Sequence, residues 1–220
     1  MSAYSDDAKD IKPLLKRLPL RWEGKPCVLE MQAAKYQWKQ VEWWAFYFEL
    51  LCSRHLSPPL IMPGEREGTM KWDAKGRINW DFKAKAIKSD SHSFILNDVA
   101  AMENSVRKHG EHGVLVALCD VEYNDADRTF QMWRTELEGG KSKYTLAREA
   151  RTPISRYRKT LAVLVEVLFV RFDADALSKL DFMAQGRNSN GKPRPKKYMF
   201  DHETCQPFVT DRIVLGKPLA

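Results

Sequence analysis

Cysteine is scarce in this chain of 220 residues, which has four cysteines and no Cys-x-x-Cys pair. Zinc ribbons and dithiol redox centres need such pairs, so we expect four reduced thiols. The chain also lacks a His-x-x-x-His pair, a Gly-x-Ser-x-Gly turn, a Walker loop and a dinucleotide-binding glycine fingerprint. These absences argue against zinc proteases, serine hydrolases and enzymes that use a nucleotide cofactor.

Long apolar runs are missing as well. The longest, Leu161 to Val170, is interrupted by Glu166 and is too short to cross a bilayer. Residues 1–12 are polar and acidic, whereas a signal peptide begins basic and then becomes apolar. We therefore expect a cytoplasmic protein with no membrane partner.

Basic residues outnumber acidic ones, and the formal net charge of +7 gives a pI near 9.2. A basic protein attracts polyanions, and nucleic acid is the commonest polyanion that a soluble protein meets. The hydrophobic share of 44% and the charged share of 30% are ordinary for a soluble globular domain. The composition therefore favours a folded protein with a nucleic-acid partner.

The most informative segment of the chain runs from Asp73 to Lys83. Apolar and polar residues alternate from Ile78 onwards, which predicts a strand with one buried face, and Asp81 and Lys83 then share the other face. Gly76 supplies a permissive backbone for a hairpin that brings Asp73 towards Asp81. Two carboxylates and an amine would then bind Mg²⁺ and position a water for phosphodiester hydrolysis. The alternative is a weak ion pair on a solvated strand.

A helix that carries Glu42 and Glu49 is expected upstream of this segment. Residues 30–52 predict a helix with aromatic side chains over most of its surface, which favours a place in the core or contact with a partner subunit. Glu49 and Glu42 are seven residues apart on one face of that helix. Glu42 is the rival of Glu49, and a solvated residue on an amphipathic helix is the ordinary interpretation of either.

These residues resemble the active-site motif of the PD-(D/E)xK nuclease superfamily, and within it the type II restriction endonucleases. The resemblance implies an α/β fold with a restriction-endonuclease-like core, a mixed central sheet flanked by helices. It also implies that Asp73, Asp81, Glu49 and the backbone carbonyl of Phe82 bind Mg²⁺, and that Lys83 acts on the attacking water. The first acid follows Trp72, where the family pattern has proline.

A weaker local similarity is to the Pvu type of restriction endonuclease. It rests on the Pro-Gly and Arg-Glu-Gly elements within residues 62–68 and on the Lys-Tyr-x-x-Asp-His run of residues 197–202. In that enzyme a histidine-containing loop after the lysine strand contacts bases. The similarity therefore implies a base-contacting role for Ser91 and His92.

The rest of the chain fits an α/β order. Asn97 or Asp98 can cap a helix that ends at His109 and Gly110, and residues 114–119 read as a strand buried on both faces. Residues 121–133 predict a hairpin around the polar segment 124–127. His55, His109 and His112 lie near expected element ends, where an exposed histidine needs no functional role.

We expect a single domain over residues 1–220. It comprises an N-terminal lead of residues 1–30 with a short helix near residues 10–17, a catalytic core of residues 31–135, and basic, DNA-contacting and C-terminal elements in residues 136–220.

Two basic segments are candidates for holding DNA, and solvated surface is the alternative for each. The first contributes phosphate contacts from Lys141, Lys143, Arg148, Arg151, Arg156, Arg158 and Lys159. The second is interrupted by Pro and Gly and reads as a loop that can reach base edges through Arg187, Asn188, Lys192 and Arg194. Lys88, Ser91 and His92 complete the expected DNA-binding set.

The sequence therefore predicts a Mg²⁺-dependent type II restriction endonuclease that acts on double-stranded DNA. Two antiparallel strands at a symmetric site call for two active sites, so a homodimer is expected. A structure-specific nuclease of the junction-resolvase type remains open, as does a non-catalytic nucleic-acid-binding protein with the same fold. An interaction protein whose charge serves RNA or membrane contact would instead show no metal dependence.

Overall fold

A computed structural model of the chain describes residues 2–63, 71–88, 92–141, 143–150, 158–187, 191–204 and 206–219. It has the mixed α/β composition that the sequence predicts. In chain order the elements are α1 (Ala3–Leu15), β1 (Arg21–Glu23), α2 (Gly24–Ala33), α3 (Trp43–His55), β2 (Ala74–Lys75), β3 (Asn79–Ala86), β4 (Ser93–Asp98), α4 (Val99–His109), β5 (His112–Glu122), α5 (Thr129–Leu137), α6 (Lys143–Glu149), β6 (Leu161–Phe172), α7 (Ala174–Ser178), β7 (Phe182–Met183), β8 (Lys197–Asp201), a 3-10 turn (Gln206–Phe208) and β9 (Val209–Val214).

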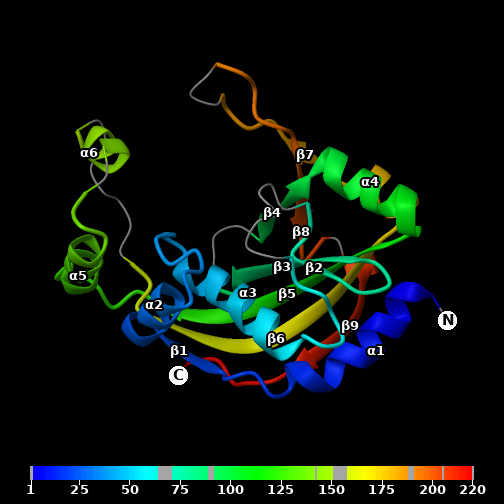
Figure 1. Cartoon of the computed structure of the whole chain (residues 1–220), viewed down its shortest axis with the longest axis horizontal. Coiled ribbons are helices and arrows are strands. Elements are labelled where there is room, and N and C mark those ends of the chain that lie inside the picture. The colour runs from blue at the N-terminus through cyan, green and yellow to red at the C-terminus, as the bar shows by residue number, and fades with distance from the viewer. Residues whose placement is uncertain are drawn as a thin grey trace.

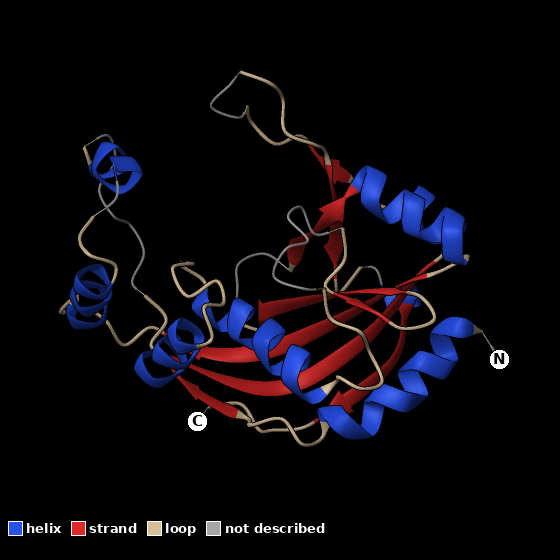
Figure 2. Ribbon diagram, in the orientation of Figure 1, coloured by secondary structure: helices blue, strands red, loops and turns tan. Residues whose placement is uncertain are grey.

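A curled six-stranded sheet forms the centre of the molecule (Figures 1 and 2). Its strand order is β1-β6-β5-β3-β2, and β9 also pairs with β6. The β3–β5 pair is parallel and the other pairs are antiparallel, so the sheet is mixed. A separate antiparallel sheet has the order β4-β8-β7.

The central sheet is covered on both faces. Side chains from α1, α2 and α3 pack against one face, together with Trp80 and Phe82 of β3. The other face packs against α4, α7 and the small sheet, through residues such as Met102 and Phe200. Because apolar layers lie on both sides, β5 is buried along nearly its whole length, as its continuous apolar sequence predicts.

The strand that carries the motif is more deeply buried than alternation alone predicts. Trp80 and Phe82 face the α3 side as expected, but Asn79 and Asp81 on the opposite face are buried as well. The reason is that α4 and the small sheet cover that second face. Asp81 is therefore a carboxylate inside the protein.

Helix boundaries differ from the sequence-based expectation in two places. The expected lead of residues 1–30 forms α1, β1 and part of α2, and α1 begins at an N-cap in which Ser2 accepts from the amide of Ser5. The single helix expected over residues 30–52 is two helices, because Lys35 and Gln37 adopt positive φ angles between them. The aromatic residues at the start of α3 are buried in the core, as preferred, namely Trp43, Trp44, Tyr47 and Phe48.

The helix expected up to His109 is confirmed as α4, with Asp98 at its N-cap position and Gly110 in the left-handed conformation at its C-cap. The hairpin expected over residues 121–133 is wrong, since β5 is followed by α5. The Asp125 carboxylate accepts from the amides of Phe130 and Gln131, and these bonds fix the start of that helix.

No helix within the described residues is long and apolar enough to cross a membrane.

Candidate active site

The β2–β3 hairpin places Asp73 at the open edge of the central sheet. The amide of Asp73 donates to the carbonyl of Trp80 across the hairpin, at 2.9 Å. β2 covers only Asn79 and Trp80 of β3, so the next edge-facing amide, that of Phe82, has no strand partner on this side. Asp73 Oδ2 accepts from that amide at 2.7 Å. The carboxylate thus replaces a neighbouring strand and is held against the backbone of β3.

The amine of Lys83 completes this edge. Its Nζ lies 3.4 Å from Asp73 Oδ2 and 3.1 Å from the backbone carbonyl oxygen of Phe82. The side chains of Asp73 and Lys83 are each about one fifth exposed, at 23% and 20%. A carboxylate, an amine and a backbone carbonyl therefore meet at a place that solvent reaches.

Asp81 lies behind this edge and is fixed by two polar neighbours. Both of its carboxylate oxygens accept from Nδ2 of Asn97, at 3.2 and 3.1 Å. Oδ2 also lies 3.1 Å from Nε2 of His112, whose Nδ1 is 2.9 Å from the Ser105 hydroxyl. Asn97 is the last residue but one of β4, and His112 begins β5, so two strands hold the orientation of this acid.

The helix-borne acid of the group is Glu49, on α3. Its Oε2 accepts from the Tyr36 hydroxyl at 3.1 Å, and Tyr36 lies in the segment between α2 and α3. Glu42, the rival candidate, is at the start of α3, where it accepts from Trp44 Nε1 and pairs with Lys159. The structure therefore brings Glu49 to Asp73, Asp81 and Lys83 and does not bring Glu42 there.

Within the described part of the chain, the group has three carboxylates and one ammonium group, and burial together with this imbalance shifts the pKa values of its members. Burial, with repulsion from Asp73, raises the pKa of Glu49 to about 8, against the opposing effect of Lys83. Burial also raises the pKa of Asp73. Burial acts to raise the pKa of Asp81 too, but Lys83, His112 and Asn97 outweigh it and hold that pKa at about 2.

The pKa of Lys83 is raised as well, which for an amine favours the charged form. Burial acts to lower its pKa, but attraction by Asp73, Asp81 and Glu49 outweighs burial and raises the pKa. A lysine with a raised pKa is charged at neutral pH, so Lys83 partly balances the charge of the acids. One ammonium group beside three carboxylates leaves an electrostatic position for a further cation.

The donor atoms present fit Mg²⁺, which prefers carboxylate and carbonyl oxygens. Among the described residues, both hydrogen bonds that Asp73 accepts go to Oδ2, which leaves Oδ1 for a cation. The oxygens of the three carboxylates do not all lie within 4.8 Å of one another, so they do not surround a common point. Among the described residues, only His92, His202 and Glu203 meet that distance. An open arrangement suits Mg²⁺, which keeps several waters and takes ligands from substrate phosphates.

The sequence did not reveal the residues that support the acids. His112 was expected to be an exposed residue at an element end, but it is wholly buried and contacts Asp81. The parallel pairing of β3 with β5 places His112 beside Asn79, on the same face as Asp81. That register depends on tertiary structure, so only the position of His112 directly before the buried strand was a usable signal. Asn97 was interpreted as a helix cap, and Tyr36 carried no recognised signal.

The expected DNA-binding residues are spread over several surfaces. Lys159 pairs with Glu42 and lies over the rings of Trp44 and Tyr123, and only 14% of its side chain is exposed, which argues against a phosphate contact. Lys88 pairs with the buried Asp120 at 3.0 Å. Arg158 is half-buried, and His92 lies 3.4 Å from Glu203.

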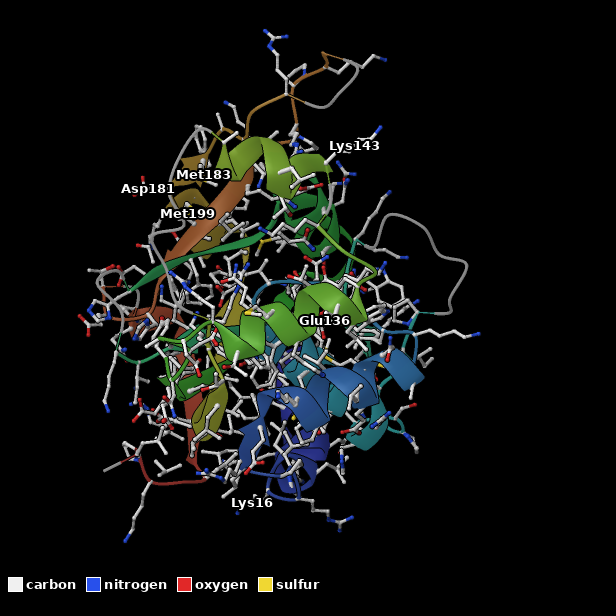
Figure 3. All side chains as sticks on the ribbon, turned by 90° about the vertical axis from the view of Figure 1, so that its left-hand side faces the viewer. Lys16, Glu136, Lys143, Asp181, Met183 and Met199 are labelled. Atoms are coloured by element: carbon white, nitrogen blue, oxygen red, sulfur yellow. The ribbon has the colours of Figure 1, made fainter. Side chains whose placement is uncertain are left out.

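The second basic segment forms an exposed loop between β7 and β8. Arg187 donates to the carbonyl of Gly191 at 2.8 Å, and Lys192 and Arg194 are exposed. In Figure 1 this loop extends from the small sheet at the top of the view, and the α5–α6 segment lies at the left. Lys143 lies on α6 and is exposed, whereas Asp181, Met183 and Met199 lie in the neighbourhood of the small sheet (Figure 3). Outside the described part of the chain lie Ser91, Arg151, Arg156, Asn188 and residues 64–68, as does the side chain of Arg148.

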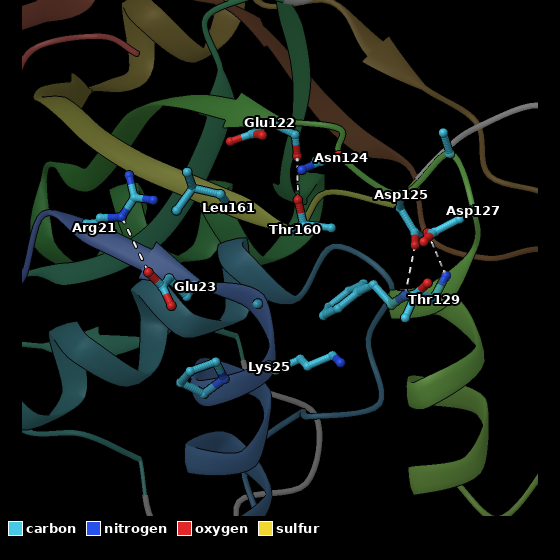
Figure 4. A pocket seen from close by; sticks show the side chains of 14 residues that line it. Arg21, Glu23, Lys25, Glu122, Asn124, Asp125, Asp127, Thr129, Thr160 and Leu161 are labelled. Atoms are coloured by element: carbon cyan, nitrogen blue, oxygen red, sulfur yellow. Dashed lines mark hydrogen bonds and ion pairs between the residues drawn. The ribbon is translucent and has the colours of Figure 1, made fainter. Parts of the chain in front are cut away.

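A pocket of about 860 Å³ lies away from these acids, between the β1–α2 junction and the β5–α5 connection (Figure 4). Asp125 and Asp127 line it, but their carboxylates accept from the amides at the start of α5, including that of Thr129 at 3.0 Å. These two aspartates therefore serve the helix start, and the group at the edge of β3 remains the candidate active site.

Comparisons of the chain with protein-family models, with curated proteins and with solved structures find no match.

Proposed function

We propose that this protein is a metal-dependent DNA endonuclease with the PD-(D/E)xK arrangement of catalytic residues. The observation that carries the proposal is the convergence of Glu49, Asp73, Asp81 and Lys83 from α3, the β2–β3 hairpin and β3. An isolated Asp-x-Lys pair on a strand is common. The set found here is more specific. It adds Glu49 from a helix, the contact of Lys83 with Asp73, and a buried Asp81 whose orientation is fixed.

The element order supports the same proposal. The helix α3, which carries an acid, is followed by a hairpin that carries the two other acids and the lysine. Next come β4 of the small sheet, the helix α4, and β5, which is parallel to the hairpin's second strand. The finer fold assignment, a restriction-endonuclease-like core, is part of the proposal and rests on this order.

The roles of the residues follow from their contacts. Mg²⁺ bound at Asp73, the Phe82 carbonyl, Asp81 and Glu49 would supply charge neutralisation for a phosphodiester and lower the pKa of a bound water. Asn97 and His112 keep Asp81 ionised and oriented. Lys83, which is positively charged, holds Asp73 in place and offsets the negative charge that develops on the phosphate during attack by water.

The substrate class rests on charge. The net charge of +7 favours a polyanion, and exposed basic residues lie on the β7–β8 loop and on α6, namely Arg187, Lys192, Arg194 and Lys143. Such contacts position a duplex without reading its sequence. We propose double-stranded DNA as the substrate and a homodimer as the acting species, since one site cuts one strand.

The test is incubation of the purified protein with unmethylated phage DNA and Mg²⁺, beside Asp81→Ala and Lys85→Ala. Lys85 is two residues beyond Lys83 on the same strand and contacts the Ser93 carbonyl, so its variant is the matched control. Discrete fragments from the parent and from Lys85→Ala, but not from Asp81→Ala, are expected. A four-way junction and single-stranded DNA run in parallel. Cleavage of the junction alone would favour a resolvase, and binding without any Mg²⁺-dependent cleavage would leave a non-catalytic DNA-binding protein.

A further inference from the structure

Two histidines and a glutamate gather at one end of the small sheet, remote in sequence from the proposed nuclease motif. β4 and β8 are antiparallel, and Ser93 pairs with Asp201. His92 directly precedes β4 and His202 directly follows β8, so the strand pairing brings these two residues together. Glu203 is the next residue. One possible ligand atom from each of the three lies within 4.8 Å of the others.

The hydrogen bond of His202 defines which of its nitrogens can bind a cation. Nδ1 of His202 lies 3.0 Å from the backbone carbonyl oxygen of His92. A carbonyl oxygen only accepts, so Nδ1 carries the proton and Nε2 of the neutral ring keeps a free lone pair. Metal-binding histidines commonly donate their other ring N–H to a backbone carbonyl in this way, which fixes both tautomer and ring orientation.

His92 presents a second nitrogen that lacks a hydrogen-bond partner. Its Nδ1 is buried and, among the described residues, makes no hydrogen bond, although Glu203 Oε1 lies 3.4 Å away. Two ligands of a tetrahedral zinc ion at about 2.0–2.1 Å from the metal are separated by about 3.3 Å. The nitrogen-to-oxygen separation is therefore that of two ligands on one ion. The His92 and His202 rings meet edge to face, with centroids 5.2 Å apart.

Asp201 orients the turn that carries Glu203. Its Oδ1 accepts from the amides of Glu203 and Thr204, at 3.0 and 3.1 Å, and its Oδ2 accepts from the Ser93 hydroxyl at 3.0 Å. The carboxylate thus joins the end of β8 to the beginning of β4. The ligand-bearing segments on both strands are held together before any ion binds.

We propose that His92, His202 and Glu203 form a Zn²⁺ site. Two imidazole nitrogens and a carboxylate oxygen are the donors that Zn²⁺ prefers, whereas Mg²⁺ prefers an all-oxygen set. The site is separate from the proposed Mg²⁺ site. It joins the start of β4 to the segment after β8, and the other end of β4 carries Asn97, which orients Asp81.

The experiment uses the full chain with Cys205→Ser in every protein, so that the thiol of this residue, which lies outside the described part of the chain, cannot bind the ion. Each protein is stripped with a chelator, dialysed and titrated with Zn²⁺ by calorimetry. Co²⁺ is then added, since its absorption bands report tetrahedral nitrogen and oxygen ligands. The variants are His92→Gln, Glu203→Gln and, as the matched control, Glu136→Gln, an exposed glutamate on α5 (Figure 3).

One equivalent of Zn²⁺ is expected to bind to the parent protein and to Glu136→Gln. His92→Gln and Glu203→Gln should each weaken binding by at least about tenfold, because loss even of a group that only supports a zinc ligand costs 10–100-fold. Asp73→Asn should leave this binding unchanged, which separates it from the nuclease site. The proposal is overturned if the parent binds no Zn²⁺, or if the affinity is the same in Glu203→Gln and His92→Gln as in Glu136→Gln.

Discussion

The carboxylate of Asp7 and the carboxylates of the candidate active site are held in opposite ways. Asp7, on α1, accepts four hydrogen bonds from the β2–β3 hairpin, namely from the amides of Arg77 and Ile78, from the Arg77 guanidinium and from Trp80 Nε1. Its side chain is 2% exposed, and both of its carboxylate oxygens accept hydrogen bonds. Glu49 and Asp73, by contrast, share a single lysine, and burial raises the pKa of both.

The contrast separates a structural carboxylate from one available for chemistry. A buried carboxylate whose hydrogen bonds are complete holds two elements together and has no capacity left for a ligand. A group of acids with too few donors is costly to keep in the folded protein and gains most from a cation or a substrate. The β2–β3 hairpin has both kinds of carboxylate. Asp7 binds its turn, and Asp73 lies at its open end.

The largest effect on the cleavage rate is expected from removing Lys83, the lysine beside the acids of the candidate active site. Lys83→Ala should lower the cleavage rate by about a hundredfold or more, the scale found when one stabilising group is removed from a developing charge. The measurement is the rate of Mg²⁺-dependent DNA cleavage at saturating enzyme. Lys85→Ala is the control, and equal loss in both variants would remove the special role of Lys83.

The satisfied acid should matter for stability instead. Asp7→Ala leaves the Trp80 and Ile78 donors without a partner inside the protein and should lower the free energy of unfolding by about 3 kcal/mol. Asp10 binds the same arginine at 2.9 Å, but its side chain is 43% exposed, so Asp10→Ala should cost less than about 1 kcal/mol. Urea unfolding followed by tryptophan fluorescence measures both, and similar costs would contradict the comparison.

The residues that orient Asp81 should affect cation binding more than stability. Asn97→Ala removes the amide that bonds both oxygens of Asp81, and we expect the Mg²⁺ concentration for half-maximal cleavage to rise about tenfold. Asn104→Ala, on the exposed side of α4, is the matched control. An unchanged Mg²⁺ requirement in Asn97→Ala would mean that Asp81 is not a metal ligand.

A pH dependence of stability is also expected from Glu49. Its pKa is raised from 4.5 to about 8 in the folded protein, so the folded state binds this proton more tightly than the unfolded state. The stabilisation that Glu49 contributes is therefore complete below pH 4.5 and is lost as the pH rises through about 8.

In chelator, Glu49→Gln should flatten the fall in unfolding free energy between pH 5 and pH 8. Glu42→Gln should leave that slope unchanged, because the pKa of Glu42 is lowered and not raised. Burial acts to raise this pKa, but Lys159 and Trp44 outweigh the effect of burial. Urea unfolding across this pH range is the measurement. A slope that survives in Glu49→Gln would assign it to another group.

The acids and the lysine of the candidate site could be predicted from the sequence because their signal is local. Asp81 and Lys83 are two residues apart on one strand, Asp73 is one hairpin away, and Glu49 lies on a strongly aromatic helix. β5 and α4 were predictable for the same reason, from a continuous apolar run and from Gly110. Each of these features depends on neighbours within about ten residues.

The supporting contacts were not predictable because they depend on register between distant segments. His112 reaches Asp81 only through the β3–β5 pairing, and Asp7 reaches the hairpin across some 70 residues of chain. Gly76 was expected to supply a permissive backbone, but its φ angle is not positive. A Cβ there would lie 2.3 Å from Asp7 Oδ2, so glycine is needed because the Asp7 carboxylate lies against it. Nothing in the residues around Gly76 predicts that contact.

The outer edge of β6 has a consequence for association between molecules. β1 covers residues 161–163 of that edge and β9 covers residues 166–170, so two short strands from opposite ends of the chain share one long strand. A protein trimmed before β9 would present a row of unpaired amides and carbonyls on a long, largely apolar strand. Such an edge is a template for intermolecular strand addition, so the C-terminal strand protects this protein against aggregation.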